Sequence, residues 1–408
     1  MMLSKLLLNA LGLVTVALPV AAYDLPKTVA EAEVMERADA LPSTSFYSAP
    51  TNLETTKPGD LLRRESFSGY TLPEGIGTVR ILYHSQDAHR RDLVTSAVVL
   101  IPGGTAPVGG WPIIAWAHGT SGVAQQCAPS LMKDLYYGDE GLSAMVKGGF
   151  AVVATDYQGL GTQGPHQYVS KTAQAFDVIY SVPAARAAVP ELGRRWVADG
   201  HSQGGLAAWG VAELESGMTD VDYLGAISVA GAVKLDDFIQ FINDTQGGSH
   251  YLAYLASGIQ ALFPAFKPED MLSQDAMRLY SKSITQGCWF YGYAAFKDMP
   301  KGTTLRGDWK KNPSLQRFVR ENEEGAVHVN KPLLVLAGEA DLTIPIEGVR
   351  QIVRRACLKG GDVAFKSYPG LDHDPTMVES TPYQLAWIRD RLAGKESPST
   401  CPARANPR

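Results

Sequence analysis

Gly200-His201-Ser202-Gln203-Gly204 is the stretch of sequence that decides the fold of this chain. It follows a short apolar run, residues 196–198, and it precedes a helix-like stretch, residues 206–214. A strand, a sharp turn and a helix therefore meet at a serine, and the flanking glycines leave room for the cramped backbone of such a turn. This context predicts a nucleophile at Ser202, with the Gln203 amide directed at the group under attack. The alternative is a plain glycine-rich turn.

Strand and helix signals alternate on both sides of this turn. Continuous apolar runs predict strands, and apolar residues at helical spacing predict helices. Buried strands that alternate with helices indicate an α/β fold with a mainly parallel sheet and helices on both faces. Ligands of such sheets bind at the carboxyl ends of the strands. The expected strands are residues 79–84, 93–101, 111–117, 150–155, 196–198, 223–233, 332–337 and 363–368, and the main expected helices are 173–188, 206–214, 346–356 and 383–393.

The domain organisation follows from where this alternation starts and stops. Residues 23–75 are mixed in character, and we expect them to form an arm wrapped over the fold. The core is expected in two parts, 76–233 and 327–395, followed by a tail at 396–408. Between the two parts, residues 234–326 are rich in aromatic side chains at helical spacing. They predict a helical insertion that caps the active site; the alternative is a helical subdomain with only its own small core.

Length, charge and the N-terminus narrow the class of protein. The chain has 408 residues and a formal net charge of −5, which gives no electrostatic case for binding nucleic acid or an anionic membrane. Lys5, an apolar run at residues 6–20 and the small residues Ala21 and Ala22 predict a secretory signal peptide at 1–22. The alternative, a membrane anchor, is disfavoured because the run is short and lacks a basic flank.

The cysteines agree with export. The chain holds four, Cys127, Cys288, Cys357 and Cys401, and no C-x-x-C pair, so a structural metal site is not expected. In an oxidising compartment an even count predicts two disulfides, for which the count alone allows three connectivities. Asn243 begins a glycosylation sequon, which is usable only in a host that glycosylates secreted chains.

A serine hydroxyl needs a base, and the base needs a group that orients it. In α/β-hydrolases the chain order is serine, acid, histidine. Asp341 follows the expected strand at 332–337 and is the acid candidate, with Asp236 and Asp237 as rivals after the preceding strand. His373 is the base candidate, on a glycine- and proline-containing loop after the last expected strand.

The second oxyanion donor of such enzymes comes from the loop after the third strand. Here that loop reads His118-Gly119-Thr120, so the Thr120 amide is expected to join that of Gln203. The alternative is a glycine-rich turn without an oxyanion role. The chain contains no P-loop, zinc signature or calcium loop, and we expect neither a cofactor nor a metal.

Taken together, these residues resemble the secretory lipase family of fungi and actinobacteria, within the α/β-hydrolase superfamily. The resemblance covers most of the mature chain. Its motifs are Phe46-Tyr47, Gly59-Asp60-Leu61-Leu62-Arg63, Tyr83-His84-Ser85, His118-Gly119-Thr120, Tyr157-Gln158-Gly159-Leu160-Gly161, the turn at Ser202, Gly338-Glu339-Ala340-Asp341 and His373. The arm and the large insertion favour this family over others of the superfamily.

The resemblance implies hydrolysis of carboxylic esters, a helical cap over an acyl pocket, and no cofactor. It also implies a disulfide between Cys127 and Cys288, which leaves Cys357 with Cys401 as the second pair. His201 is a departure, since many members have an aromatic residue there. That difference bears on the range of substrates more than on the mechanism.

The sequence therefore predicts a secreted serine hydrolase, either a lipase or a carboxylesterase, that acts on a small-molecule or lipid ester. Transient contact with a lipid interface fits this prediction, and no obligate protein partner is evident. Two alternatives remain open. One is a serine peptidase or acyl-transfer enzyme with the same triad, and the other is a non-catalytic binding module with a hydrolase fold.

Overall fold

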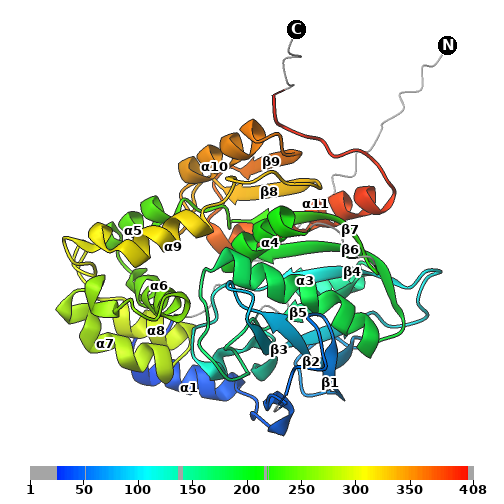
Figure 1. The fold of residues 1–408 in the computed structure, drawn as a ribbon, viewed down its shortest axis with the longest axis horizontal. Coiled ribbons are helices and arrows are strands. Elements are labelled where there is room, and N and C mark those ends of the chain that lie inside the picture. Colours follow the sequence, from blue (N-terminus) through cyan, green and yellow to red (C-terminus); the bar gives the residue numbers. More distant parts are fainter. Residues whose placement is uncertain (1–24, 51, 137–140, 216–217, 219, 403–408) are drawn as a thin grey trace, which may run out of the picture.

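The computed structural model describes residues 25–402 except 51, 137–140, 216–217 and 219. The expected signal peptide lies outside these residues. Within them, a single sheet has the strand order β1-β2-β3-β5-β4-β6-β7-β8-β9 (Figure 1). The strands are β1 (Leu61–Ser66), β2 (Gly77–Gln86), β3 (Asp92–Ile101), β4 (Trp111–Ala117), β5 (Ala151–Thr155), β6 (Leu192–His201), β7 (Asp222–Val229), β8 (Leu333–Gly338) and β9 (Val363–Tyr368).

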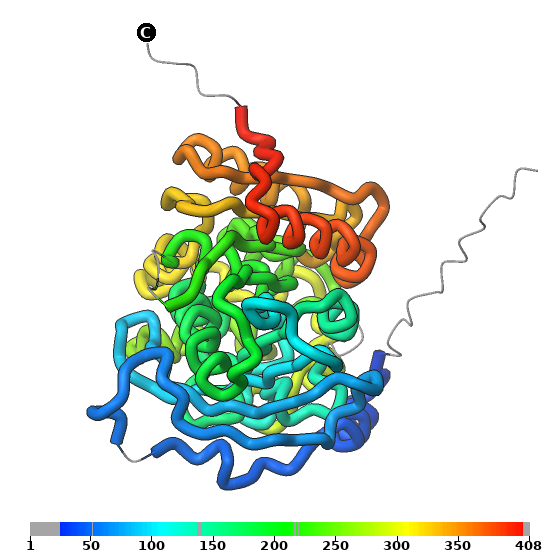
Figure 2. The backbone as a smooth tube through the Cα atoms, turned by 90° about the vertical axis from the view of Figure 1, so that its right-hand side faces the viewer, coloured from blue at the N-terminus to red at the C-terminus, as the bar shows by residue number. Residues whose placement is uncertain are grey.

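The sheet is mainly parallel, as predicted. Strands β1, β2, β3 and β5 pair in antiparallel fashion, and every pair from β5 through β4 to β9 is parallel. All residues of β5 and β8 are buried, which is why these strands read as continuous apolar runs. Figure 2 shows the blue N-terminal strands at one edge of the molecule and the orange and red C-terminal elements at the opposite edge.

Helices cover both faces of the sheet. Residues of α3 (Lys171–Ala188), α4 (Gln203–Leu214) and α10 (Ile346–Leu358) pack with alternate strand residues in one buried cluster. Residues of α2 (Ser143–Lys147) and α11 (His373–Leu392) pack in a second cluster with the other set of strand residues. Because successive side chains of a strand point to opposite faces, these two clusters are the two sides of a three-layer α/β core.

Five helices lie between β7 and β8, where the sequence predicted a helical insertion. They are α5 (Leu235–Asp244), α6 (Ser249–Leu262), α7 (Gln274–Thr285), α8 (Trp289–Phe296) and α9 (Pro313–Asn322). In Figure 1 they lie together beside one end of the sheet. The Val233 amide donates a hydrogen bond to the buried Glu324 carboxylate, so the two ends of the segment lie side by side.

The N-terminal arm has more structure than the sequence predicted. Its helix α1 (Val29–Asp39) begins at the N-cap Thr28, whose side chain accepts a hydrogen bond from the Glu31 amide. Ala32 of α1 is buried in a small cluster with Tyr291 and Ala294 of α8 (Figure 1). Strand β1, also in the arm, extends the sheet at its antiparallel edge. The arm is thus attached to both the sheet and the helical insertion.

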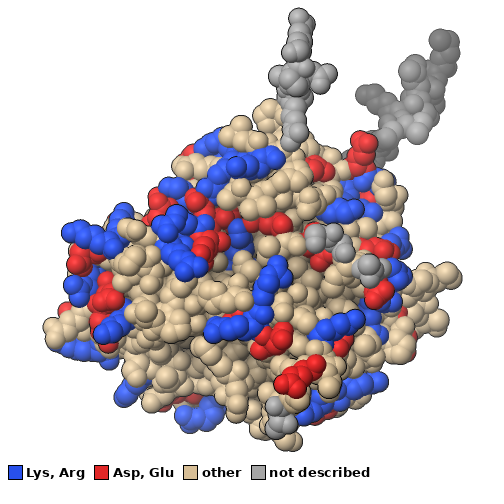
Figure 3. All heavy atoms as spheres, in the orientation of Figure 1, with Lys and Arg blue, Asp and Glu red and all other residues tan. Residues whose placement is uncertain are grey.

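Charged side chains of both signs are interspersed on the face drawn in Figure 3. This distribution agrees with the small net charge of −5 and offers no single-sign patch on that face to a polyanion. Among the helices of the described residues, none combines the length and the apolar character that a membrane span needs.

Candidate active site

The turn between β6 and α4 holds Ser202 in a strained backbone conformation. Its φ of 57° and ψ of −121° lie in a region that side-chain-bearing residues rarely adopt, at a cost of about 1–3 kcal/mol. The flanking glycines are needed because a Cβ at Gly204 would overlap the carbonyl oxygen of Ala117, and one at Gly200 would overlap that of Gly204. The Ser202 amide donates to the Val229 carbonyl at 2.9 Å. The strained turn is therefore fixed by the strands on both sides of β6.

An acid and a base meet beside this turn. Asp341 lies three residues after the end of β8, and its Oδ1 accepts hydrogen bonds from the amides of Thr343 and Ile344, both at 2.7 Å. Its Oδ2 lies 2.8 Å from Nδ1 of His373. The carboxylate is thus held from behind by the backbone and oriented toward one edge of the imidazole ring.

His373 is the first residue of α11, not part of a loop as its sequence context predicted. Asp372 caps this helix, since its side chain accepts from the His373 amide at 2.8 Å. With Nδ1 facing Asp341, the opposite ring nitrogen, Nε2, is buried and has no hydrogen-bond partner among the described residues. His373 and Ser202 line the same cavity. This arrangement leaves Nε2 available to a hydroxyl or a substrate.

The electrostatics of the pair favour its charged form. Burial acts to lower the pKa of His373, but the Asp341 carboxylate, aided by Asp374 and Asp372, outweighs burial and raises the pKa to about 9. Burial likewise acts to raise the pKa of Asp341, but the His373 cation and the backbone amides hold that pKa below its usual value. A basic imidazole next to an ionised carboxylate is the combination that general-base catalysis requires.

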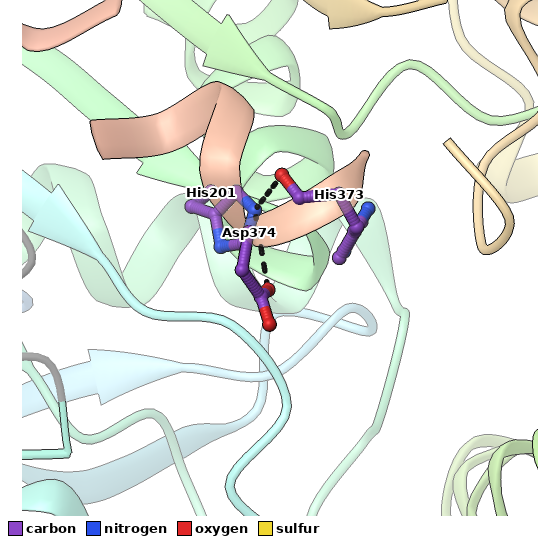
Figure 4. Close-up of side chains that lie close together, drawn as sticks. All are labelled: His201, His373 and Asp374. Carbon is purple, nitrogen blue, oxygen red and sulfur yellow. Dashed lines mark hydrogen bonds and ion pairs between the residues drawn. The ribbon is translucent and has the colours of Figure 1, made fainter. Parts of the chain in front are cut away.

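His201 packs against this pair, which the sequence analysis did not foresee. Its ring centroid lies 4.8 Å from that of His373, and its Nε2 lies 3.4 Å from the His373 carbonyl oxygen and 3.9 Å from Oδ1 of Asp374 (Figure 4). Burial, followed by the nearby His373 charge, lowers the pKa of His201 to about 4. A neutral His201 ring therefore supports the backbone that carries His373. The contact joins positions 172 residues apart, so no local sequence pattern could predict it.

His201, His373 and Asp374 also have potential metal-ligand atoms within 4.8 Å of one another, and no other such group occurs among the described residues. In this structure Nδ1 of His373 is hydrogen-bonded to Asp341 and Nε2 of His201 faces the carbonyl oxygen of His373, so we assign no metal to the group. In Figure 4 the contacts of His201 run to the carbonyl group of His373 and the carboxylate of Asp374. The geometry is that of hydrogen-bonded support.

Of the two expected oxyanion residues, Gln203 follows Ser202 directly and Thr120 lines the same cavity as Ser202. Gln203 is the first residue of α4, so its N–H belongs to the helix-terminal amides without an intrahelical acceptor. Thr120, just after β4, lines the cavity; its Oγ1 is 2.8 Å from the Tyr168 hydroxyl, and its carbonyl accepts from the Tyr136 hydroxyl at 2.7 Å. These contacts engage the Thr120 hydroxyl and carbonyl and so hold this residue in place at the cavity.

The cavity at Ser202 has a volume of about 940 Å³. Three parts of the chain line it: the core, the helical insertion and the N-terminal arm. The core contributes Ser202, His373, Thr120 and Leu342; the insertion contributes Tyr251, Trp289 and Phe290; and the arm contributes Met35, Glu36 and Leu41. A concave, mostly apolar cavity of this size that also holds polar groups is typical of a small-molecule site.

The structure contains the two disulfides that the resemblance implied, Cys127–Cys288 and Cys357–Cys401. The first ties the segment after the oxyanion loop to the residue that precedes α8. Next to it, the Trp289 amide donates to the Ser121 carbonyl at 2.9 Å. This disulfide therefore fixes the wall of the cavity near Thr120, whereas the second joins the C-terminal tail to α10.

We expect the double variant Cys127→Ser/Cys288→Ser to lose about 2–5 kcal/mol of stability, because the bond closes a loop with a sequence separation of 161. It should also lose kcat, because α8 is no longer held beside the oxyanion loop. The matched control is Cys357→Ser/Cys401→Ser, with a separation of 44, which should melt earlier but keep its kcat. Melting curves and ester hydrolysis measure both effects. An equal fall of kcat in the two variants would contradict this assignment.

The glycosylation sequon begins at a packed residue. Asn243 is only 6% exposed, and its Oδ1 accepts a hydrogen bond from the Leu305 amide at 3.0 Å. A glycan on its amide nitrogen would force this side chain out of its packed position. The structure thus argues against glycosylation at Asn243.

Comparison with known proteins places these features in a family. The model of the protein family described as "Secretory lipase" matches residues 136–400 of this chain. The "Secreted triacylglycerol lipase LIP7" of Malassezia globosa is 21% identical over 88% of this chain and 80% of its own length. A Mycobacterium tuberculosis protein named "Probable inactive lipase MT1628" is 22% identical over 87% and 83%. Among solved structures, Candida antarctica lipase A in its closed state matches with a TM-score of 0.74 and 16% identity over 90% of this chain and 91% of its own.

Proposed function

The chain belongs to the secretory lipase family, and we propose that Ser202, His373 and Asp341 are the catalytic triad with which it hydrolyses esters. The protein is a secreted carboxylic ester hydrolase with the α/β-hydrolase fold. The observation that carries the triad is the 2.8 Å bond from Nδ1 of His373 to Asp341, with the unpartnered Nε2 beside the cavity that Ser202 lines.

The reaction follows from these positions. Nε2 of His373 takes the proton of the Ser202 hydroxyl while the oxygen attacks the ester carbonyl, and the amides of Gln203 and Thr120 stabilise the oxyanion. His373 then gives the proton to the leaving alcohol as the C–O bond breaks, which leaves an acyl group on Ser202. Water, deprotonated by the same ring, attacks this acyl group, and the acid is released while Ser202 regains its proton.

The lining of the cavity supports a lipid ester as substrate. Apolar side chains from all three parts of the chain line the cavity, which suits an ester linked to hydrocarbon, although charged residues such as Glu33, Arg37 and Asp134 line it as well. The helical insertion, residues 234–326, serves as the cap, since Tyr251, Trp289 and Phe290 come from it. The residues next to the cavity include Leu342, which is 67% exposed and suited to contact with a lipid surface.

A comparison of emulsified triacylglycerols with soluble p-nitrophenyl esters tests the substrate class. We expect hydrolysis of both, with higher rates on acyl chains of eight or more carbons than on acetate. A protein that cleaves only acetate and butyrate would be a carboxylesterase for small substrates and would contradict a lipid substrate. A panel of peptide amides should show no turnover, and turnover there would favour the peptidase alternative.

The non-catalytic alternative is kept in the test because one relative carries the name of an inactive lipase. A folded protein that cleaves no ester and is not labelled by a fluorophosphonate would be such a binding module. The intact serine, acid and histidine of this chain predict the opposite result.

A further inference from the structure

Helix α1 of the N-terminal arm borders the cavity at Ser202. The cavity at Ser202 is lined by residues of α1 and of the turn after it, including Met35, Glu36, Ala40 and Leu41. The arm was expected only to wrap the fold, and the acyl pocket was assigned to the helical insertion. Instead, α1 and α8 together form one side of the cavity.

The spacing of residues on α1 explains how it does so. Ala32, Met35, Glu36 and Asp39 lie at i, i+3, i+4 and i+7 and therefore share one face of the helix. Ala32 is fully buried against Tyr291 and Ala294 of α8, while Met35, Glu36 and Asp39 line the cavity. This face thus packs on the insertion and borders the cavity, which Glu33 and Arg37, outside this face of α1, also line.

Glu36 fastens α1 to α8. Its Oε2 accepts from the Cys288 amide at 2.9 Å, and its Oε1 accepts from the Tyr291 amide at 2.8 Å. Cys288 is the N-cap of the eight-residue helix α8 and Tyr291 lies in its first turn, where a negative charge is favourable. Burial raises the pKa of Glu36, although the bonds from Cys288 and Tyr291 oppose that shift. A carboxylate of the arm therefore caps the helix that carries Trp289 and Phe290 into the cavity.

The C-terminal end of α1 is fixed as well. Ala40 forms an antiparallel bridge with Met132, and the Leu41 amide donates to the Leu131 carbonyl at 2.7 Å. Leu131 and Met132 also line the cavity. With Glu36 at one point and this bridge at another, α1 is a fixed wall of the cavity. Met35 is the apolar side chain that α1 contributes to the lining, and its charged side chains there are Glu33, Glu36, Arg37 and Asp39.

We propose that α1 is a specificity-determining wall of the substrate cavity, that Met35 sets the length of hydrocarbon chain accepted, and that Glu36 is the positioning residue that holds this wall on α8. The proposal rests on ester hydrolysis at Ser202 and adds the residues that select the substrate. The chain in question is a hydrocarbon chain, which an ester can carry on its acyl side or on its alcohol side. Met35 suits this role because its side chain is unbranched and adapts its shape to its neighbours.

The test compares Met35→Trp, Met35→Ala and Glu36→Gln with the unaltered protein. The control is Met277→Trp, which places the same bulk at a half-buried methionine on α7, away from the cavity. One series of substrates is p-nitrophenyl esters from acetate to palmitate. The other is butyrate esters of alcohols of increasing length. Circular dichroism and fluorophosphonate labelling report whether each variant is folded with a reactive Ser202.

We expect Met35→Trp to lower kcat/KM for the longest chains by about tenfold or more, whereas kcat/KM for acetate should change by less than about threefold. The reason is that the bulkier side chain removes contacts with methylene groups of a long chain, and each lost contact lowers kcat/KM severalfold. Met35→Ala should move the optimum to longer chains. Glu36→Gln should raise KM for long chains with little change of kcat. Whichever series responds identifies the side of the ester that lies along α1.

Equal effects on acetate and on the longest substrates of both series, or no effect beyond that of Met277→Trp, would overturn the proposal. If the variants at Met35 do not fold, the profile of Glu36→Gln decides. These results are separate from those of Ser202→Ala. If hydrolysis depends on Ser202 but the chain-length profile is unchanged in the α1 variants, the proposed role of α1 is wrong and the proposed hydrolysis still stands.

Discussion

Replacing Ser202 with alanine is expected to abolish ester hydrolysis, with kcat lowered by about 10⁶-fold. The Ser202 hydroxyl is the nucleophile that attacks the ester carbonyl in the proposed mechanism, and without it no acyl-enzyme can form. Hydrolysis of p-nitrophenyl butyrate at pH 8 measures the effect. The fold should survive, because the substitution keeps the Cβ and the backbone bond to Val229.

Ser281→Ala is the matched control for this experiment. Ser281 is an exposed serine on α7, and its loss should leave both rate and stability unchanged. A residual rate in Ser202→Ala within tenfold of the unaltered protein would exclude Ser202 as the nucleophile. The search would then turn to the other groups that line the cavity.

Asp341→Asn is expected to lower kcat by about 10⁴-fold. The Asp341 carboxylate holds His373 in the tautomer with a free acceptor at Nε2, and the amide of asparagine does not. The same change should alter the pH dependence. The neutral imidazole is the active form, so kcat/KM of the unaltered protein should rise with pH until it passes the His373 pKa of about 9. Without the Asp341 charge that pKa falls, and the rise of the residual rate should move to lower pH.

Rate profiles from pH 5 to 10 measure this shift. Asp237→Asn is the control, since Asp237 was a rival acid in the sequence and lies exposed on α5, 2.9 Å from the Lys234 ammonium group. An exposed ion pair of this kind contributes little to stability, and its loss should leave the rate unchanged. The assignment of Asp341 as the acid would be contradicted if the rise of kcat/KM with pH stayed at the same pH in Asp341→Asn, or if Asp237→Asn lost most of its rate of hydrolysis.

The sequence predicted the parts of the fold whose signals are local. The turn at Ser202 and the continuous apolar strands are read from neighbouring residues, and the order of Ser202, Asp341 and His373 follows from the strands that precede them. Because the carboxyl ends of parallel strands meet at one edge of the sheet, that order was enough to predict that Asp341 pairs with His373 and that His373 shares a cavity with Ser202.

Features that depend on distant partners were missed. Helix α1 has little apolar character of its own, and its buried Ala32 is covered by Tyr291 and Ala294, some 260 positions further along the chain. The packing of His201 on His373 and the capping of α8 by Glu36 are likewise long-range. No periodicity within either segment carries that information, since helix stability in proteins comes mostly from tertiary packing.

The start of α11 was missed for a different reason. Asp372 is a favourable N-cap, and Pro375 lies in the first turn, where proline is tolerated. These are start signals for a helix, whereas the expectation of a loop rested on Pro369 and Gly370, which precede the helix. The consequence for the site is physical, because a base on the first turn of a long helix is held more rigidly than one on a loop.

The most direct measurement of the central claim is mass spectrometry of the protein after treatment with a fluorophosphonate. The triad predicts one adduct per chain, on the proteolytic peptide that contains Ser202, formed in proportion to the loss of esterase activity and far more slowly in Asp341→Asn. Full inactivation with the adduct on another residue, or a labelled Ser202 with undiminished hydrolysis, would contradict the account.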